Sequence, residues 1–461
     1  MKNTIKKFGV LVVAFATVLA MTTTAFASTA VPGEQGAFTE KDTPTTQAKE
    51  IVFEKELTAY NKDEAKVNAP EISYTYTIAP ATVEAGTQVT DNADKHESNS
   101  PVTVPVSAGV TTGLSATTAT ITWTNADQLD AADDGAANKK EVKLNFENVV
   151  FPKTGIYRYV ITEALTTGYA YASSGVTEGS STDKTRYMDV YVKPSSTYTD
   201  GTNASDWDIY GFTCFINNTS ITDADKTTNA VKVDGFTEHT ENTTGTETTV
   251  NADSYYTYNL TVEKEVKNDG YGAATVAFPF TVIFTNSTIT RNIDIAKAST
   301  TTATGWNDPE SAALSAGTTK GIVNIKSGQK AKFVGIPNGT SVEVYETNTA
   351  TGVTYSVTTA LTTNATTTTT DDAVTWAAAP TTAEAQAAEK AASQSTKATF
   401  TTTANEDDNN AYAVKVTNTL VTISPTGVVL RIAPYALILG AGILLLLLAR
   451  RRKTEKEAYA A

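Results

Sequence analysis

Cysteine and histidine are almost absent from this 461-residue chain, which has one Cys and two His. One cysteine excludes a disulfide framework, and three residues of these two kinds are too few for a usual zinc or haem site. Positive charge is also scarce, because 36 Lys and Arg stand against 50 Asp and Glu, a formal net charge of −14. Such a balance would repel nucleic-acid phosphates. The sequence therefore predicts no cofactor, no metal and no nucleic-acid partner.

The residues that are abundant favour β-structure. Hydrophobic residues make up 40% and charged residues 19% of the chain, which are values near those of globular proteins. Short alternating runs rich in Thr, Val and Tyr are separated by turn signals such as Pro-Asn-Gly at 337–339. This pattern is typical of β-sandwiches, and the length suggests two or three domains. We expect an all-β protein.

The start of the chain has the pattern of an export signal. A basic start is followed by an apolar stretch at 10–21 and by Ala-Phe-Ala at 25–27. This order predicts a secretory signal peptide over residues 1–27 that is removed on export. The next residues, 28–48, are rich in Thr, Gly and Pro, and we interpret them as a leader.

The end of the chain combines three elements within residues 422–461. An apolar stretch at 432–449 is long enough to span a bilayer, and Arg-Arg-Arg-Lys follows it at 450–453. The basic cluster would stay in the cytoplasm, which leaves the preceding chain outside the cell. Just upstream stands the pentapeptide Ile423-Ser424-Pro425-Thr426-Gly427. A plain single-pass membrane anchor is the alternative, but it would not require that pentapeptide.

These three elements together resemble the cell-wall sorting signal of Gram-positive surface proteins, which is the substrate of sortase transpeptidases. The usual pentapeptide is Leu-Pro-x-Thr-Gly, whereas here Pro is third, as in variants found among pilins. The resemblance implies that sortase cleaves between Thr426 and Gly427. Thr426 would then pass through a thioester on the enzyme to an acceptor amine.

Composition divides the intervening chain into two domains. We predict a first domain over 49–242, a linker over 243–255 and a second domain over 256–421. A Thr-rich segment at 362–410 is interpreted as a large loop insertion in the second domain. Within it, residues 383–392 have a helix-forming composition.

The first domain places two charges among apolar positions. Because side chains alternate along a strand, Lys55 shares a face with Ile51, Phe53 and Leu57. Glu163 likewise shares a face with Tyr157, Tyr159, Ile161 and Leu165. Burying an ion costs several kcal/mol unless it is paired or neutralised. A buried Lys–Glu ion pair is one explanation, and strands shifted so that the charges reach solvent are another.

The second domain repeats this arrangement. Lys264 is in phase with Leu260, Val262 and Val266, and Glu346 is in phase with Val342 and Val344. Asn418 shares a face with Val414, Val416 and Leu420. The repetition favours a common chemical purpose over two accidental ion pairs.

The motifs around these residues resemble two related families. Ile-Val-Phe-Glu-Lys at 51–55 and Gly-Ile-Tyr-Arg-Tyr-Val-Ile-Thr-Glu at 155–163 resemble the streptococcal pilin isopeptide-linkage family. Tyr-Asn-Leu-Thr-Val-Glu-Lys at 258–264 and Val-Thr-Asn at 416–418 resemble collagen-adhesin B-type domains. The resemblance implies two Ig-like β-sandwich domains in tandem.

The resemblance also implies a self-made crosslink in each domain. Lys264 would attack the carboxamide of Asn418 with help from Glu346, which would release ammonia. In the first domain Lys55 is the amine and Glu163 the promoting carboxyl group. The family's closing Gly-Phe-Thr-Asn is Gly-Phe-Thr-Glu here, which puts Glu238 at the acceptor position. Three asparagines are fallback acceptors, namely Asn242, Asn217 and Asn251. An ion pair from Lys55 to Glu163 or Glu238 without a bond is equally open.

Polymerisation by sortase requires an exposed acceptor lysine as well. Lys193, in Tyr-Val-Lys-Pro, loosely resembles a pilin acceptor element, and Lys226 and Lys232 are competitors. For each of these, an ordinary solvated lysine is the alternative.

We expect a structural pilin subunit on the cell wall of a Gram-positive bacterium rather than an enzyme. Its partners would be sortase, neighbouring subunits and peptidoglycan, with the membrane contacted only through the sorting segment before cleavage. The first alternative is a monomeric wall-anchored adhesin for a host-surface ligand. The second is a secreted enzyme such as a glycosidase, for which only scattered Asp and Glu speak.

Overall fold

The computed structural model describes most of the chain between Lys49 and Thr422. The residues within that range that it does not describe are 63, 92–101, 181–182, 217–232, 244–245, 268–276, 302–303, 307–311, 315–316, 347–350, 364–365, 379–396 and 403–410. Beyond it, only residues 439, 441 and 443–445 are described.

Several sequence-based predictions therefore concern residues outside the described part. They are the signal peptide, the leader, the helix-forming stretch at 383–392, the sorting pentapeptide, most of the apolar stretch at 432–449, and the residues Asn217, Lys226 and Lys232. No helix among the described residues is long and apolar enough to cross a bilayer.

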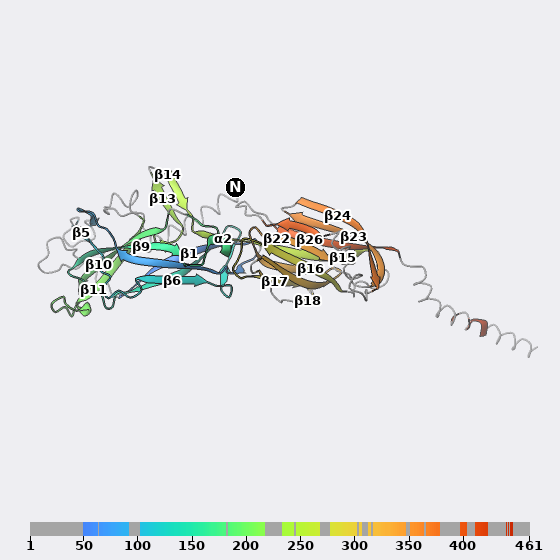
Figure 1. Ribbon diagram of the computed structural model, residues 1–461, viewed down its shortest axis with the longest axis horizontal. Coiled ribbons are helices and arrows are strands. Elements are labelled where there is room, and N and C mark those ends of the chain that lie inside the picture. Colours follow the sequence, from blue (N-terminus) through green and yellow to red (C-terminus); the bar gives the residue numbers. More distant parts are fainter. Residues whose placement is uncertain are drawn as a thin grey trace, which may run out of the picture. The chain divides into compact units, whose positions relative to one another are not determined.

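The described chain is built almost entirely of β-strands, which confirms the predicted class (Figure 1). It divides into two compact units. The first is formed mainly by residues up to Thr257, with the short segments 287–294 and 314–317, and the second by the remainder from Tyr258 onward.

Among its described residues, the first unit contains fourteen complete strands, one short helix and one 3-10 turn. They are β1 (Glu50–Tyr60), β2 (Lys66–Asn68), β3 (Ile72–Pro80), β4 (Gln88–Asp91), β5 (Val102–Ala108), β6 (Thr118–Trp123), β7 (Gln128–Asp130), β8 (Ala136–Asn145), β9 (Gly155–Leu165), α2 (Tyr171–Ser174), β10 (Thr185–Pro194), η2 (Ala204–Asp206), β11 (Trp207–Phe215), β12 (Gly235–Phe236), β13 (His239–Thr243) and β14 (Thr246–Val250). The first residues of β15 (Asp253–Lys267) also belong to it.

Two sheets of this unit face each other. One has the order β11-β10-β9-β3-β6, with β5 joined to β9. In the other, β1 lies between antiparallel β8 on one edge and, on the other edge, parallel β12 and the first residues of β15. Phe53 of β1 packs edge-on against Tyr76 of β3, with ring centroids 5.2 Å apart. The chemistry-bearing faces of β1, β3 and β9 therefore meet in the interior.

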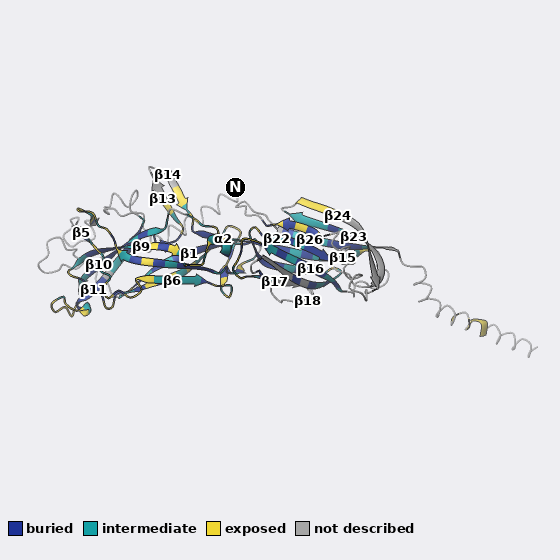
Figure 2. Ribbon diagram, in the orientation of Figure 1, coloured by how far each residue is buried: buried dark blue, intermediate teal, exposed yellow. Residues whose placement is uncertain are grey.

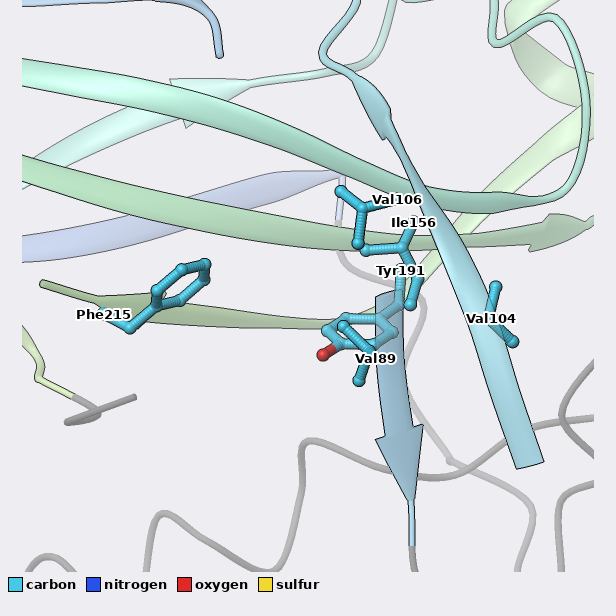
Figure 3. Packing of buried hydrophobic residues seen from close by; sticks show 6 residues of the cluster. All are labelled: Val89, Val104, Val106, Ile156, Tyr191 and Phe215. Carbon is cyan, nitrogen blue, oxygen red and sulfur yellow. The ribbon is translucent and has the colours of Figure 1, made fainter. Parts of the chain in front are cut away.

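Burial along β1 follows the expected alternation at its start and then becomes continuous (Figure 2). Ile51, Phe53 and Leu57 are buried, and Lys55 is buried with them at 3% exposure. A further apolar cluster lies where β4 and β5 meet β9, β10 and β11 (Figure 3). It consists of Val89, Val104, Val106, Ile156, Tyr191 and Phe215.

The second unit is also made of two sheets. Its strands are the remainder of β15, β16 (Ala277–Asn286), β17 (Ile293–Thr301), β18 (Thr304–Trp306), β19 (Ala312–Leu314), β20 (Gly317–Lys326), β21 (Lys330–Pro337), β22 (Ser341–Glu346), β23 (Thr351–Thr363), β24 (Thr366–Ala378), β25 (Ala398–Thr401) and β26 (Ala411–Thr422). One sheet has the order β19-β17-β21-β15-β26-β23-β24 and the other β18-β20-β16-β22-β25. Phe284 of β16 contacts Phe333 of β21 across the interior, with ring centroids 5.6 Å apart.

Two segments differ from the sequence-based interpretation. The expected linker, 243–255, contains strand β14 and the start of β15. The expected loop insertion, 362–410, contains β24, which pairs along its length with β23. Both segments are rich in threonine, whose β-branched side chain suits a strand as well as a polar loop. Polar composition alone therefore misassigned them.

Candidate functional site

In the first unit, Lys55 lies between two carboxyl groups. Its Nζ is 3.1 Å from Glu163 Oε1 on β9 and 2.8 Å from Asp253 Oδ2 at the start of β15. All three side chains are almost completely buried. The structure thus brings Lys55 and Glu163 together as the sequence suggests, and it adds Asp253, a residue that sequence reasoning missed.

Two tyrosines of β3 hold the two carboxyl groups. Tyr76 lies directly opposite Glu163 in the antiparallel pair and donates its hydroxyl to Glu163 Oε2 at 2.9 Å. Tyr74, two residues earlier on the same face, donates to Asp253 Oδ2 at 2.8 Å. Burial, together with the neighbouring carboxylates, raises the pKa of both tyrosines well above the usual value, so both hydroxyls remain protonated donors.

The electrostatics of the first site keep Asp253 ionised before any reaction. Burial by itself would raise the pKa of Asp253, but the ammonium groups of Lys55 and Lys184 and a hydrogen bond from the Gly179 N–H outweigh it and lower that pKa. Lys184 also lies 3.4 Å from Glu163 Oε1. The ground state of this site is therefore a buried cluster of ion pairs.

The second unit contains the three residues expected there. Lys264 Nζ is 2.8 Å from Glu346 Oε2, and Asn418 Nδ2 donates to Glu346 Oε1 at 2.8 Å. Lys264 is completely buried, and desolvation lowers its pKa despite the opposing charge of Glu346. Among the described residues, Asn418 Oδ1 is buried without a hydrogen-bond partner. Burial thus makes the neutral form of the Lys264 amine easier to reach, and the Asn418 carboxamide oxygen beside it can still accept a hydrogen bond.

The strand register is the same at both sites. In the first unit Leu57 of β1 pairs with Asp253 of β15, and Lys55 lies two residues before Leu57. In the second unit Val266 of β15 pairs with Asn418 of β26, and Lys264 again lies two residues earlier. Both strand pairs are parallel. Such diagonal neighbours on one face are within reach of a long side chain.

The expected first-domain acceptors lie elsewhere. Glu238 is exposed, because β12 is only two residues long and ends at Phe236, and the chain then enters the separate β13–β14 hairpin. Asn251 is exposed as well, and the backbone of Asn242 belongs to that hairpin. The second carboxyl group that the structure places beside Lys55 is that of Asp253 and not the expected Glu238.

The remaining candidates are less distinctive. Lys193 is half-buried near the end of β10 and pairs across the strands with Asp208 of β11. Cys214 is buried, and desolvation raises the pKa of its thiol to about 12, so it is not a nucleophile. Within the described part of the chain, no three His, Cys, Asp or Glu side chains are grouped as metal ligands.

The chain was compared with protein families, curated proteins and solved structures. The profile of a family described as a domain of unknown function (DUF7601) matches residues 258–423. No curated protein matches the chain significantly.

Solved structures with some similarity include two major pilins of Streptococcus pyogenes. One is 15% identical, with 80% of this chain and 99% of that chain covered and a TM-score of 0.36. The other, T3.2, is 19% identical, with 81% and 99% covered and a TM-score of 0.35. A Mobiluncus mulieris adhesin with intramolecular disulfide, isopeptide and ester crosslinks is 11% identical, with 81% and 100% covered and a TM-score of 0.22.

Proposed function

We propose that this protein is a structural surface subunit of the pilin type, attached and polymerised by sortase through Thr426 and strengthened by two self-formed isopeptide bonds. The observation that carries the proposal is the repeated buried arrangement of a lysine, a promoting glutamate and an acceptor side chain in the same strand register. Lys264, Glu346 and Asn418 form one set, and Lys55, Glu163 and Asp253 form the other.

At the second site the reaction is an aminolysis of a carboxamide. The neutral amine of Lys264 attacks Cγ of Asn418, the new Nζ–Cγ bond forms, and the Cγ–Nδ2 bond breaks to release ammonia. Glu346 touches both partners, so it can donate a proton to the carboxamide and carry the proton from the amine to the departing nitrogen. Because the fold holds the amine and the carboxamide together at a high effective concentration, the proposed reaction requires no cofactor.

At the first site the same attack expels water. Lys55 bonds to Cγ of Asp253, the Cγ–Oδ2 bond breaks, and two of the three ammonium hydrogens leave with Oδ2. Glu163 lies 3.1 Å from the amine and can transfer them. Lys55, Glu163 and Asp253 border a small pocket, which gives the released water a way out.

The surface role is supported by the export and sorting signals in the sequence. A crosslink between a first and a last strand closes most of each unit into a loop and, unlike a disulfide, cannot be reduced. That property suits a surface protein that has only one cysteine and so cannot form an intramolecular disulfide. The proposed partners are sortase, neighbouring subunits and peptidoglycan, and Lys193 is the described candidate for the acceptor amine.

The intact mass of the full chain, made in a cell-free reaction with mild detergent, tests the crosslinks. We expect it to be short of one ammonia and one water. Lys264→Ala and Glu346→Ala should each restore the ammonia, and Asp253→Ala should restore the water. Glu238→Ala is the matched control and should leave both losses intact. An unshifted mass of the parent chain would exclude self-crosslinking.

The polymer itself is tested on the producing cell. We expect a ladder of covalent high-mass species that Thr426→Ala abolishes and that a single lysine substitution, such as Lys193→Ala, reduces to the monomer. A wall-attached monomer without any ladder would favour the adhesin instead.

A further inference from the structure

The carboxyl group of Asp253 has a separate hydrogen-bond donor on each oxygen. Tyr74 donates its hydroxyl to Oδ2 at 2.8 Å, and the backbone N–H of Gly179 donates to Oδ1 at 2.9 Å. Lys55 Nζ approaches Oδ2 at 2.8 Å. The amine and both donors therefore meet at the one carboxyl group of Asp253.

Tyr74 is held so that its hydroxyl has little freedom. It is completely buried in β3, and its ring packs edge-on against Trp123 with centroids 5.9 Å apart. The ammonium group of Lys55 lies 4.4 Å from the centroid of the same ring. One side chain thus positions the amine through its face and the acceptor through its hydroxyl.

Gly179 is held equally firmly by the backbone. Thr177, two residues earlier, exchanges two hydrogen bonds of 2.8 Å with Ser254, the neighbour of Asp253. A Cβ at Gly179 would lie 2.2 Å from the carbonyl oxygen of Asn251. Only glycine can bring its N–H this close to the Asp253 carboxyl group.

We propose that Tyr74 is a catalytic residue of the first crosslink and that it forms, with the Gly179 N–H, a two-donor cradle for the tetrahedral intermediate at Asp253. This inference rests on the proposed function, because it concerns the same condensation. As the amine adds to Cγ, negative charge gathers on the oxygens. The Gly179 N–H stabilises it on Oδ1, which becomes the amide oxygen, and Tyr74 stabilises it on Oδ2. Oδ2 departs as water with two hydrogens from the Lys55 ammonium group, so the Tyr74 hydroxyl keeps its own proton.

The chemistry of the acceptor explains why this site has the cradle. A carboxyl group that rests in an ion pair is a poor electrophile, whereas a carboxamide is already neutral. At the second site, no donor within the described residues reaches Asn418 Oδ1. The second crosslink lacks the cradle, so its rate of formation is an internal reference for the rate of the first.

The rate of water loss in Tyr74→Phe tests the proposal. The full chain is made in a short cell-free synthesis, translation is stopped, and the intact mass is followed over time. We expect the loss of water to slow about a hundredfold, while the loss of ammonia keeps its parent rate. Tyr255→Phe is the matched control, because Tyr255 is fully buried in the same unit and its hydroxyl has no partner among the described residues. It should not slow either loss.

Cys214 reports whether the first unit has folded. It is the only cysteine and is buried, so maleimide labels it slowly only when the unit is intact. We expect slow labelling in Tyr74→Phe, as in the parent chain. Parent-like water loss in Tyr74→Phe would overturn the cradle and leave the crosslink standing. Fast labelling of Cys214 in Tyr74→Phe would mean that the slower water loss comes from impaired folding, which would also overturn the cradle. The same conclusion would follow if Tyr255→Phe slowed water loss equally. Absence of water loss from the parent chain would overturn the crosslink and the cradle together.

Discussion

Lys55 and Asp253 lie on neighbouring parallel strands, two residues out of register, with Nζ 2.8 Å from Oδ2. Lys264 and Asn418 lie in the same relationship in the other unit. Diagonal neighbours on one face of a sheet are within reach of a long side chain. The two units therefore place the lysine and its proposed acceptor at the same offset, although the proposed acceptors differ.

Loss of the second crosslink should lower stability more than loss of an ordinary buried asparagine. Asn418→Ala removes the bond but keeps the Lys264–Glu346 ion pair. Because the bond closes a loop of more than a hundred residues, we expect the free energy of unfolding to fall by about 5 kcal/mol. Urea denaturation of the full chain measures it.

The matched control is Asn286→Ala, since Asn286 is also buried and bonds Thr340 Oγ1 and the carbonyl of Asn338. Its cost should be about 1–3 kcal/mol. Equal costs for both substitutions would contradict a crosslink at Asn418.

Acid sensitivity should reveal whether Asp253 is bonded. Glu163→Gln removes the proton carrier and leaves the Lys55–Asp253 ion pair unreacted. Because the folded pKa of Asp253 lies below its usual 3.8, the ionised group stabilises the fold above that value, and this stability is lost as the pH falls through the folded pKa. In the bonded chain Asp253 is an amide and cannot titrate.

We therefore expect the melting temperature of Glu163→Gln to fall below that of the parent chain most steeply at pH values under about 4. Scanning calorimetry across the acid range measures the difference between the two proteins. A difference that is constant with pH would argue that Asp253 is not ionised in the unreacted state.

The burial of the three second-unit residues could be predicted from the sequence, because they stand within strong alternating runs. Lys264, Glu346 and Asn418 each replace an apolar residue on a buried face, and the face follows from counting by two. Their mutual contact depends on pairing between β15 and β26, which are far apart in the chain. That pairing came only from the family resemblance.

The first site was only half accessible to the same reasoning. Asp253 is in phase with the buried Tyr255 and Thr257, so alternation alone could have marked it as a charge on an apolar face. It was missed because the preceding Thr-rich stretch was interpreted as a linker that ended at residue 255. The two hydrogen-bond donors to Asp253 could not be predicted from the sequence. Tyr74 has the pattern of an ordinary core residue, and the Gly179 N–H is brought to Asp253 only by the tertiary fold.

The second crosslink should form faster as the pH rises. Desolvation lowers the pKa of Lys264, so the fraction of neutral amine increases with pH until the solution passes that lowered value. Ammonia loss after a short cell-free synthesis, followed at about pH 6, 7 and 8, should show a rate that climbs with pH. A rate that falls throughout this range would contradict attack by the neutral amine of Lys264.

The ion pair of Arg158 and Asp189 gives a prediction that is independent of any crosslink. These two residues face each other on β9 and β10, both are completely buried, and Arg158 Nε and Nη2 donate to the carboxylate at 2.7 and 2.8 Å. Desolvation raises the pKa of Asp189 despite the nearby guanidinium group, which shows how costly its burial is. Asp189→Asn removes the negative charge to which two guanidinium nitrogens are bonded, so the unfolding free energy should fall by about 3–5 kcal/mol.

Replacement of both partners by apolar residues should recover most of that loss. In Arg158→Met/Asp189→Leu no charge remains buried, and the methionine can still pack on Phe215, whose ring centroid lies 4.6 Å from the guanidinium carbon. Urea denaturation of Arg158→Met, Asp189→Leu and the double variant gives the coupling energy directly. A double variant as unstable as Asp189→Asn would mean that the pair stabilises the first unit through its hydrogen-bond geometry, rather than merely avoiding an unpaired charge.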